Sequence, residues 1–259
     1  MTIIRIFFKY QILSFIIFLF IGCQSNKKEE VLRIATASNT QFVIKKLIKK
    51  FTNKTGITCE LIVGSSGKHT AQILQGAPYH LFLSADQQYP QTIYKKGMTN
   101  QPPVTYAYGQ LVLWSTNKKI NVTPDELTHP MIKRIVIPNP EVAPYGSAAI
   151  AFLKHQSLYE KVKSKLVYAE SISQANHFIL TGAVSIGFTS LSTVLAKDIE
   201  TKGTWIKLPD TSYPPIAQDL VITTKEEVPV QNAQKFINFI LSEEAGIILK
   251  DFGYLLPTR

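Results

Sequence analysis

The sequence is poor in the residues that build metal and disulfide sites. It has two cysteines, Cys23 and Cys59, in 259 residues. Its five histidines, at positions 69, 80, 129, 155 and 177, never recur at a spacing such as His-x-x-x-His. Such isolated residues do not supply the ligand set of a zinc site. We therefore expect no metal cation held by protein ligands, and we expect Cys59 to be a small hydrophobic strand residue.

Long hydrophobic runs, dense charged blocks and internal repeats are also missing. The apolar run at residues 12–21, interrupted only by Ser14, is shorter than the roughly 20 residues that a membrane-spanning helix needs. The net charge is +10, but the lysines are spread along the chain. This pattern favours a solvated basic surface that attracts small anions, and no nucleic-acid partner is expected.

The N-terminus has the features of a targeting segment. Arg5 and Lys9 precede the apolar run, which ends in Phe-Ile-Gly-Cys at residues 20–23. This end resembles a bacterial lipobox, with Phe20 where Leu is usual; a plain secretory signal is the alternative. The resemblance implies a lipoprotein signal peptide at residues 1–22 and lipidation of Cys23 as the first mature residue. Residues 23–30 are then a tether, and loss of Arg5 and Lys9 lowers the net charge from +10 to +8.

Strand and helix patterns alternate along the rest of the chain, which is 45% hydrophobic and 18% charged. The first series predicts strands at residues 31–37, 57–63 and 80–84 with helices between them, as in a parallel sheet. A strand at residues 108–114 leaves this lobe, and a second series has strands at 133–137, 166–169 and 184–188. The Pro-rich residues 209–215 suggest a return to the first lobe. The fold class expected is α/β with two lobes.

Two polar turns follow strands of the first series. Gly64, Ser65, Ser66 and Gly67 join the strand at 57–63 to a helix, and Ser38-Asn39 follows the strand at 31–37. The carboxyl ends of parallel strands meet at one edge, where ligands bind in such sheets. Helix N-termini present unpaired N–H groups that bind anions. These residues therefore predict an anion site, although each alone could be a simple helix cap.

Two enzyme motifs fail at this stretch. A P-loop needs Gly at position 62 and Ser or Thr at position 69, where this chain has Ile62 and His69. A nucleophile elbow around Ser66 needs Gly at position 68, which is Lys68. A Ser66–Lys68 hydrolase would lack a third, orienting group. We expect no enzyme activity.

Fragments across nearly the whole chain after residue 31 resemble the periplasmic molybdate-binding proteins of molybdate ABC importers. They are Ala37-Ser38-Asn39, Gly64-Ser65-Ser66-Gly67-Lys68, Ala71-Gln72-Ile73, Gly76-Ala77-Pro78, Phe82-Leu83-Ser84-Ala85-Asp86, Gly109-Gln110-Leu111-Val112-Leu113-Trp114, Asn139-Pro140, Ala143-Pro144-Tyr145-Gly146, Ser173-Gln174-Ala175 and Gly253-Tyr254.

The resemblance implies a two-lobed periplasmic-binding-protein fold of type II, with two crossings and a ligand cleft between the lobes. Lobe 1 is expected at residues 31–107 plus 213–259, and lobe 2 at residues 108–212. The oxyanion-binding residues implied are Ser38, Asn39, Ser66, Tyr145 and Ile172, the last through its backbone N–H. Three more could support them from behind: Ser65, Gly67 and Ser190.

The function implied is that of a solute-binding lipoprotein in the periplasm or another extracytoplasmic space. It would bind molybdate or tungstate without a cofactor and deliver it to an inner-membrane ABC permease. We expect a monomer anchored by lipid. The alternatives are a sulfate or phosphate receptor and, more remotely, a Ser-Lys hydrolase.

Overall fold

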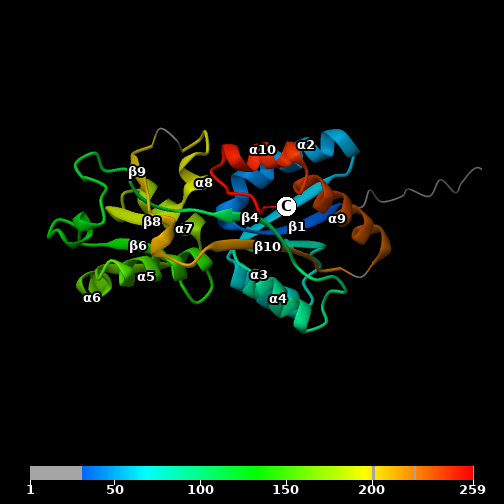
Figure 1. Ribbon diagram of the computed structural model, residues 1–259, viewed down its shortest axis with the longest axis horizontal. Coiled ribbons are helices and arrows are strands. Elements are labelled where there is room, and N and C mark those ends of the chain that lie inside the picture. The colour runs from blue at the N-terminus through cyan, green and yellow to red at the C-terminus, as the bar shows by residue number, and fades with distance from the viewer. Residues whose placement is uncertain (1–30, 200–201, 225, 259) are drawn as a thin grey trace, which may run out of the picture. The chain divides into compact units, whose positions relative to one another are not determined.

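Two five-stranded sheets organise the computed structural model, which describes residues 31–199, 202–224 and 226–258. In Figure 1 the elements of the first sheet run from blue through cyan to the green β4 and return in brown and red, and those of the second are green and yellow. The predicted signal peptide, Cys23 and the tether lie outside the described residues. We call the half built on each sheet the first lobe and the second lobe.

The first sheet has the strand order β2-β1-β3-β10-β4. Strand β1 pairs in parallel with β2 and β3, whereas β10 is antiparallel to both of its neighbours. The strands are β1 (Leu32–Ala37), β2 (Cys59–Gly64), β3 (Leu81–Leu83), β4 (Val104–Gly109) and β10 (Ile216–Ile222).

Helices cover both faces of the first sheet because successive strand side chains point to opposite faces. Ile34 belongs to the core under one group of helices, and Ala35 belongs to the core under the other. The first group is α2 (Gln41–Thr55), α9 (Glu227–Ile240) and α10 (Glu243–Asp251); the second is α3 (Ser66–Leu74) and α4 (Gln88–Lys95).

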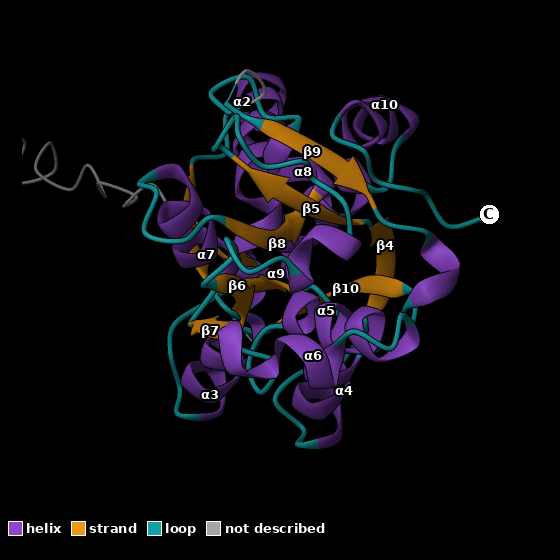
Figure 2. Ribbon diagram, turned by 90° about the vertical axis from the view of Figure 1, so that its left-hand side faces the viewer, coloured by secondary structure: helices purple, strands orange, loops and turns teal. Residues whose placement is uncertain are grey.

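The second sheet has the order β7-β6-β8-β5-β9, and Figure 2 shows its strands one above another. Ile135 and Ile137 pack with α5, whereas Val136 between them packs with α7 on the other face. The strands are β5 (Leu111–Ser115), β6 (Ile135–Pro138), β7 (Leu166–Ala169), β8 (Ile186–Ser190) and β9 (Thr204–Lys207). The helices are α5 (Pro144–His155), α6 (Tyr159–Val162), α7 (Ile172–Leu180) and α8 (Leu191–Val194). Short 3-10 turns are η1 (Ser38–Thr40), η2 (Asp125–Thr128), η3 (Lys163–Lys165) and η4 (Asp210–Ser212).

The chain passes between the sheets twice, first from β4 to β5 and then from β9 through η4 to β10. One continuous strand over residues 108–114 was a wrong prediction. It is broken at Gln110, because Tyr108 pairs with β10 of the first sheet and Leu111 pairs with β8 of the second. The C-terminal segment lies beside this crossing, where Tyr108 and Leu255 exchange backbone hydrogen bonds of 2.8 and 3.0 Å. The predicted α/β class with two crossings is confirmed.

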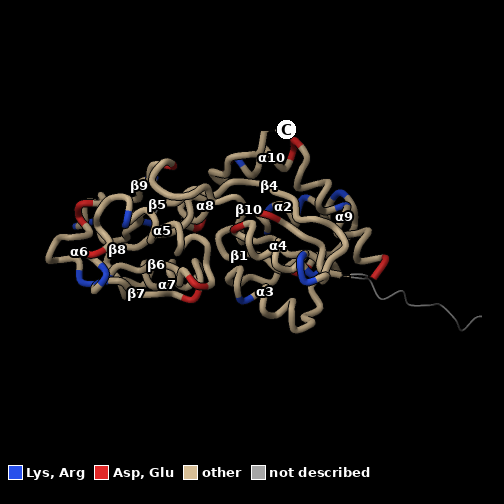
Figure 3. Tube along the Cα trace, turned by 60° about the horizontal axis from the view of Figure 1, so that its bottom comes forward, with Lys and Arg blue, Asp and Glu red and all other residues tan. Residues whose placement is uncertain are grey.

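Charged residues of both signs are interspersed along the described trace (Figure 3). Within the described part of the chain, no group of His, Cys, Asp and Glu side chains has the arrangement of a metal site. The described helices also include none with the length and apolarity required to cross a membrane.

Candidate functional site

A narrow pocket lies where β1, β2 and β3 of the first lobe end opposite the first turns of α5 and α7. Its cavity volume is about 10 Å³, which corresponds to the space for about one water molecule between the surrounding atoms. The lining residues are small, neutral or apolar: Ala37, Ser38, Asn39, Ser65, Ser66, Ala85, Ala143, Pro144, Tyr145 and Ile172.

The structure brings all five residues expected to bind the oxyanion into this lining, together with Ser65. Gly67 and Ser190, also expected nearby, are not part of it. The N–H of Gly67 donates to the carbonyl of Val142, at 3.0 Å. The Ser190 hydroxyl lies 3.0 and 2.9 Å from the hydroxyls of Ser192 and Thr193. Gly67 therefore joins the lobes, and Ser190 is bonded within its own lobe.

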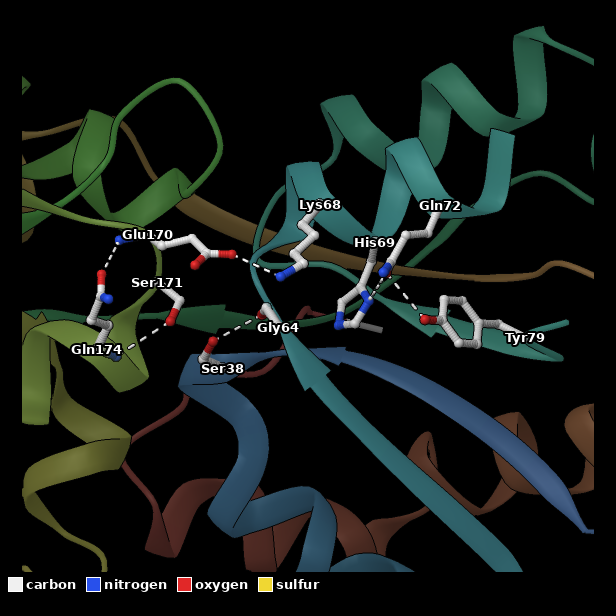
Figure 4. A network of polar contacts seen from close by, with 9 residues as sticks. All are labelled: Ser38, Gly64, Lys68, His69, Gln72, Tyr79, Glu170, Ser171 and Gln174. Carbon is white, nitrogen blue, oxygen red and sulfur yellow. Dashed lines mark hydrogen bonds and ion pairs between the residues drawn. The ribbon is translucent and has the colours of Figure 1, made fainter. Parts of the chain in front are cut away.

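Ser38 and Asn39 reach the pocket because β1 ends at Ala37 and the chain turns at once into η1. The Ser38 hydroxyl donates to the carbonyl of Gly64, at 2.8 Å, and so ties the end of β1 to the end of β2 (Figure 4). Rotation about χ1 or χ2 could redirect this hydroxyl proton to a ligand. The single hydroxyl proton of Ser38 therefore donates either to the Gly64 carbonyl or to a ligand, and not to both at once.

Ser66 is the first residue of α3, and its hydroxyl oxygen already accepts one hydrogen bond. The backbone N–H of Ala85 donates to Ser66 Oγ at 3.0 Å. This bond occupies an acceptor site of the oxygen and leaves the hydroxyl proton free to donate. Ser65, only 4% exposed, has a hydroxyl without a partner among the described residues. A buried hydroxyl without a partner is costly unless a ligand or water meets it.

Asn39 lies at the base of the pocket in a buried polar network. Its Nδ2 donates to Gln218 Oε1 and to the Tyr254 hydroxyl, each at 3.1 Å. Its Oδ1 has no partner among the described residues. A half-turn of the amide exchanges the two groups and would present the NH₂ in place of the oxygen.

Tyr145 and Ile172 bring helix N-termini of the second lobe to the pocket. Tyr145 is the second residue of α5 and Ile172 is the first of α7, so their backbone N–H groups have no acceptor within the helix. Burial raises the pKa of Tyr145 well above its usual value, which keeps the hydroxyl protonated. Ser171 caps α7, because its Oγ accepts from the N–H of Gln174 at 3.3 Å.

Charged side chains stand at the rim and not in the lining. Lys68 Nζ of the first lobe lies 2.9 Å from Glu170 Oε1 of the second (Figure 4). The hydrogen bond to Glu170 raises the pKa of Lys68, so the ammonium group stays protonated. A protonated lysine in an exposed ion pair cannot act as a general base toward Ser66, which removes the basis for a Ser-Lys hydrolase.

His69 supports the site from below. Its Nε2 lies 3.2 Å from the carbonyl oxygen of Thr36 on β1, and its Nδ1 lies 3.3 Å from Gln72 Oε1 (Figure 4). Burial lowers the pKa of His69, so the ring is neutral at pH 7. A Cβ on Gly64 would lie 2.8 Å from His69 Nε2, so a glycine is needed there. His69 therefore joins α3 to β1 behind the two serine turns.

Sequence reasoning missed two contributors that lie far along the chain from the turns. Ala85 donates only its backbone N–H to Ser66, and no residue type in a sequence indicates such a donor. Gln218 lies on β10 and contacts Asn39 only because the chain returns to the first sheet. A polar residue within the apolar pattern of β10 was the available signal for Gln218.

Comparison with known proteins places these features in context. Residues 32–255 match the family described as bacterial extracellular solute-binding protein. The molybdate-binding protein ModA of Azotobacter vinelandii is 36% identical over 239 residues, which cover 90% of this chain and 92% of that protein. ModA of Rhodobacter capsulatus is 36% identical over 222 residues, covering 85% of this chain and 86% of that protein.

The same similarity extends to a solved structure. The periplasmic molybdate-binding protein of Azotobacter vinelandii matches with a TM-score of 0.82 and 34% identity, covering 88% of this chain and 100% of that chain. The expected two-lobed periplasmic-binding-protein architecture is thereby confirmed.

Proposed function

Because this chain belongs to the family of bacterial extracellular solute-binding proteins, we propose that it binds molybdate or tungstate for an ABC importer. Family membership confirms the expectation of a binding protein and not an enzyme. The ligand assignment draws on relatives that are named for molybdate and on the chemistry of the pocket.

One observation carries the proposal: neutral hydrogen-bond donors from both lobes converge on a pocket whose lining, among the described residues, includes no charged side chain. Hydroxyl groups and helix N-termini form directional, charge-assisted bonds to an anion. Fixed ammonium groups would attract anions of any shape, whereas directional donors test where each oxygen lies. The lining therefore suits selection among oxyanions by geometry.

The donors we assign divide between the lobes. Ser38, Asn39 and Ser66 donate from the first lobe, and Tyr145 and Ile172 donate from the second, chiefly through backbone N–H groups. Ser65 stands beside Ser66 as a further hydroxyl. Bound ligand then holds the two lobes together, and its release requires them to part by a hinge at the crossings.

Size explains the expected preference. Molybdate and tungstate are nearly equal in size, and both are larger than sulfate. A smaller anion cannot reach all donors at about 2.9 Å. Each poorly made bond to a charged group loses roughly 1.5–3 kcal/mol, so two or three such losses change affinity by several orders of magnitude. Phosphate often carries a proton near neutrality, which a donor-rich pocket does not accommodate.

The cellular setting follows from the same proposal. We propose that Cys23 carries the lipid anchor, that residues 1–22 are removed and that residues 23–30 tether a monomer in the periplasm or another extracytoplasmic space. We propose functional lobes of residues 31–107 plus 213–259 and residues 108–212, with β4 continuing the first sheet as far as Gly109. Loaded protein delivers its anion to an inner-membrane permease. Mass spectrometry of the mature N-terminus tests the anchor, and a free, unmodified N-terminus beyond residue 23 would refute it.

A thermal-shift series tests the ligand. At about 100 times its dissociation constant, a ligand adds roughly 2.7 kcal/mol of stability. For a protein of this size that is a melting shift of several degrees. Molybdate and tungstate should produce the shift, whereas a shift with sulfate or phosphate alone would establish the alternative receptor.

A further inference from the structure

A glutamine on one crossing strand contacts residues of both lobes behind the pocket. Gln218 has no exposed surface and lies on β10, the strand that receives the chain from the second lobe. The ladder between β10 and β4 shifts register between Gln218 and Asp219. Such an irregularity changes the direction in which a strand side chain points. Here it accompanies a polar side chain that is directed into the base of the site.

The Gln218 amide makes three side-chain contacts, and two of them are with pocket residues. Its Oε1 accepts from Asn39 Nδ2 at 3.1 Å and from the Tyr106 hydroxyl at 3.0 Å. Its Nε2 donates to the Tyr145 hydroxyl at 3.3 Å. One amide therefore holds a first-lobe residue through its oxygen and a second-lobe residue through its nitrogen.

The neighbouring crossing leaves space for this arrangement. Gly109 ends β4, next to the break at Gln110. A Cβ at Gly109 would lie 2.0 Å from the Tyr145 hydroxyl oxygen and 2.5 Å from Gln218 Nε2. Any larger residue would push these two groups apart. The glycine is thus required for contact between Tyr145 and Gln218.

We propose that Gln218 is a positioning residue of the oxyanion site, aligning Asn39 of the first lobe with Tyr145 of the second when the lobes close on the ligand. The proposal rests on the function proposed above. Gln218 acts through these two side chains and does not line the pocket itself. An amide is suited to this role because it offers a donor and an acceptor in one group. When Asn39 turns its NH₂ toward an oxyanion, Gln218 can turn its own amide and donate to Asn39 Oδ1.

The test compares Gln218→Met with Gln110→Met. Methionine keeps the length of the side chain and removes both amide hydrogen bonds. Gln110 is a matched control because it is also buried at a crossing, but its amide bonds the Gly253 carbonyl and Lys207. We expect Gln218→Met to weaken molybdate binding by about 10- to 100-fold in calorimetry, since buried partners lose their bonds. Gln110→Met should leave the dissociation constant within about twofold.

A double-mutant cycle separates positioning from general loss of stability. In an Asn39→Ala background, Gln218→Met should change molybdate affinity less than it does in the wild type, because one of the two side chains through which Gln218 acts is gone. Additive losses of affinity would overturn the proposal, as would unchanged molybdate affinity in a folded Gln218→Met protein.

Two further variants keep the test decisive. If Gln218→Met does not fold, Gln218→Asn retains the amide but shortens its reach, and it should still weaken molybdate binding by several-fold. Gly109→Ala, which separates Tyr145 from Gln218, should weaken binding in the same direction. Wild-type affinity in both would refute the role. Failure of wild-type protein to bind molybdate would instead refute the proposed function.

Discussion

Ser66→Ala should have two effects that can be measured separately. The first is on the unliganded protein. Ser66 Oγ accepts from the buried N–H of Ala85, and alanine would leave this donor unpaired. Loss of such a partner costs roughly 1–3 kcal/mol. For a domain of this size each kcal/mol corresponds to about 2–4 °C, so the melting temperature should fall by several degrees.

The second effect is on binding. The free proton of the Ser66 hydroxyl is the donor that we assign to the oxyanion. A hydrogen bond to a charged group contributes roughly 1.5–3 kcal/mol, which corresponds to an approximately 10- to 150-fold weaker dissociation constant. Calorimetric titration with molybdate gives this number directly, and scanning calorimetry without ligand gives the first.

Ser147→Ala is the matched control for this experiment. Ser147 also lies in the first turn of a helix and also uses its hydroxyl, which donates to the carbonyl of Pro140 at 2.9 Å. It does not line the pocket. Wild-type affinity in Ser66→Ala, or an equal loss of affinity in Ser147→Ala, would refute the reasoning.

Three shorter predictions concern closure and pH. Gly67→Ala would place a Cβ 3.0 Å from Val142 Cα, so it should hinder closure and weaken molybdate binding; an unchanged affinity in calorimetry would argue against closure at this contact. Lys68→Ala should raise the molybdate release rate in stopped-flow by only a few-fold, since exposed ion pairs contribute little, and a hundredfold change would contradict this. Burial raises the pKa of Asp86, so the native protein favours the protonated acid more than the unfolded chain does. The stability of the wild type should therefore fall relative to that of Asp86→Asn as pH rises from about 4 to 7. Melting curves across this range test it, and a constant difference would show that Asp86 does not titrate as expected.

The sequence predicted that the two serine-containing turns of the candidate site lie side by side. Ser38 and Ser66 follow adjacent parallel strands, and the carboxyl ends of such strands share one edge. Tyr145 and Ile172 came from the family resemblance, since nothing local marks a backbone N–H as a ligand donor. The structure places all four on one lining.

The support behind the site could not be predicted in the same way. Gln218 meets Asn39 across 179 positions of sequence, and this contact depends on the antiparallel return of β10. The bond from the Ala85 N–H to Ser66 Oγ likewise depends on the position of β3 beside β1 in the first sheet. In both cases the contact depends on the three-dimensional path of the backbone, which residue type alone does not indicate.

Calorimetric titration of the purified wild-type protein with molybdate, tungstate, sulfate and phosphate tests the central claim most directly. The neutral, two-lobed donor set predicts strong binding of molybdate and tungstate, and dissociation constants for sulfate and phosphate that are weaker by several orders of magnitude. Equal affinities for the four anions, or binding of sulfate without molybdate, would contradict the account.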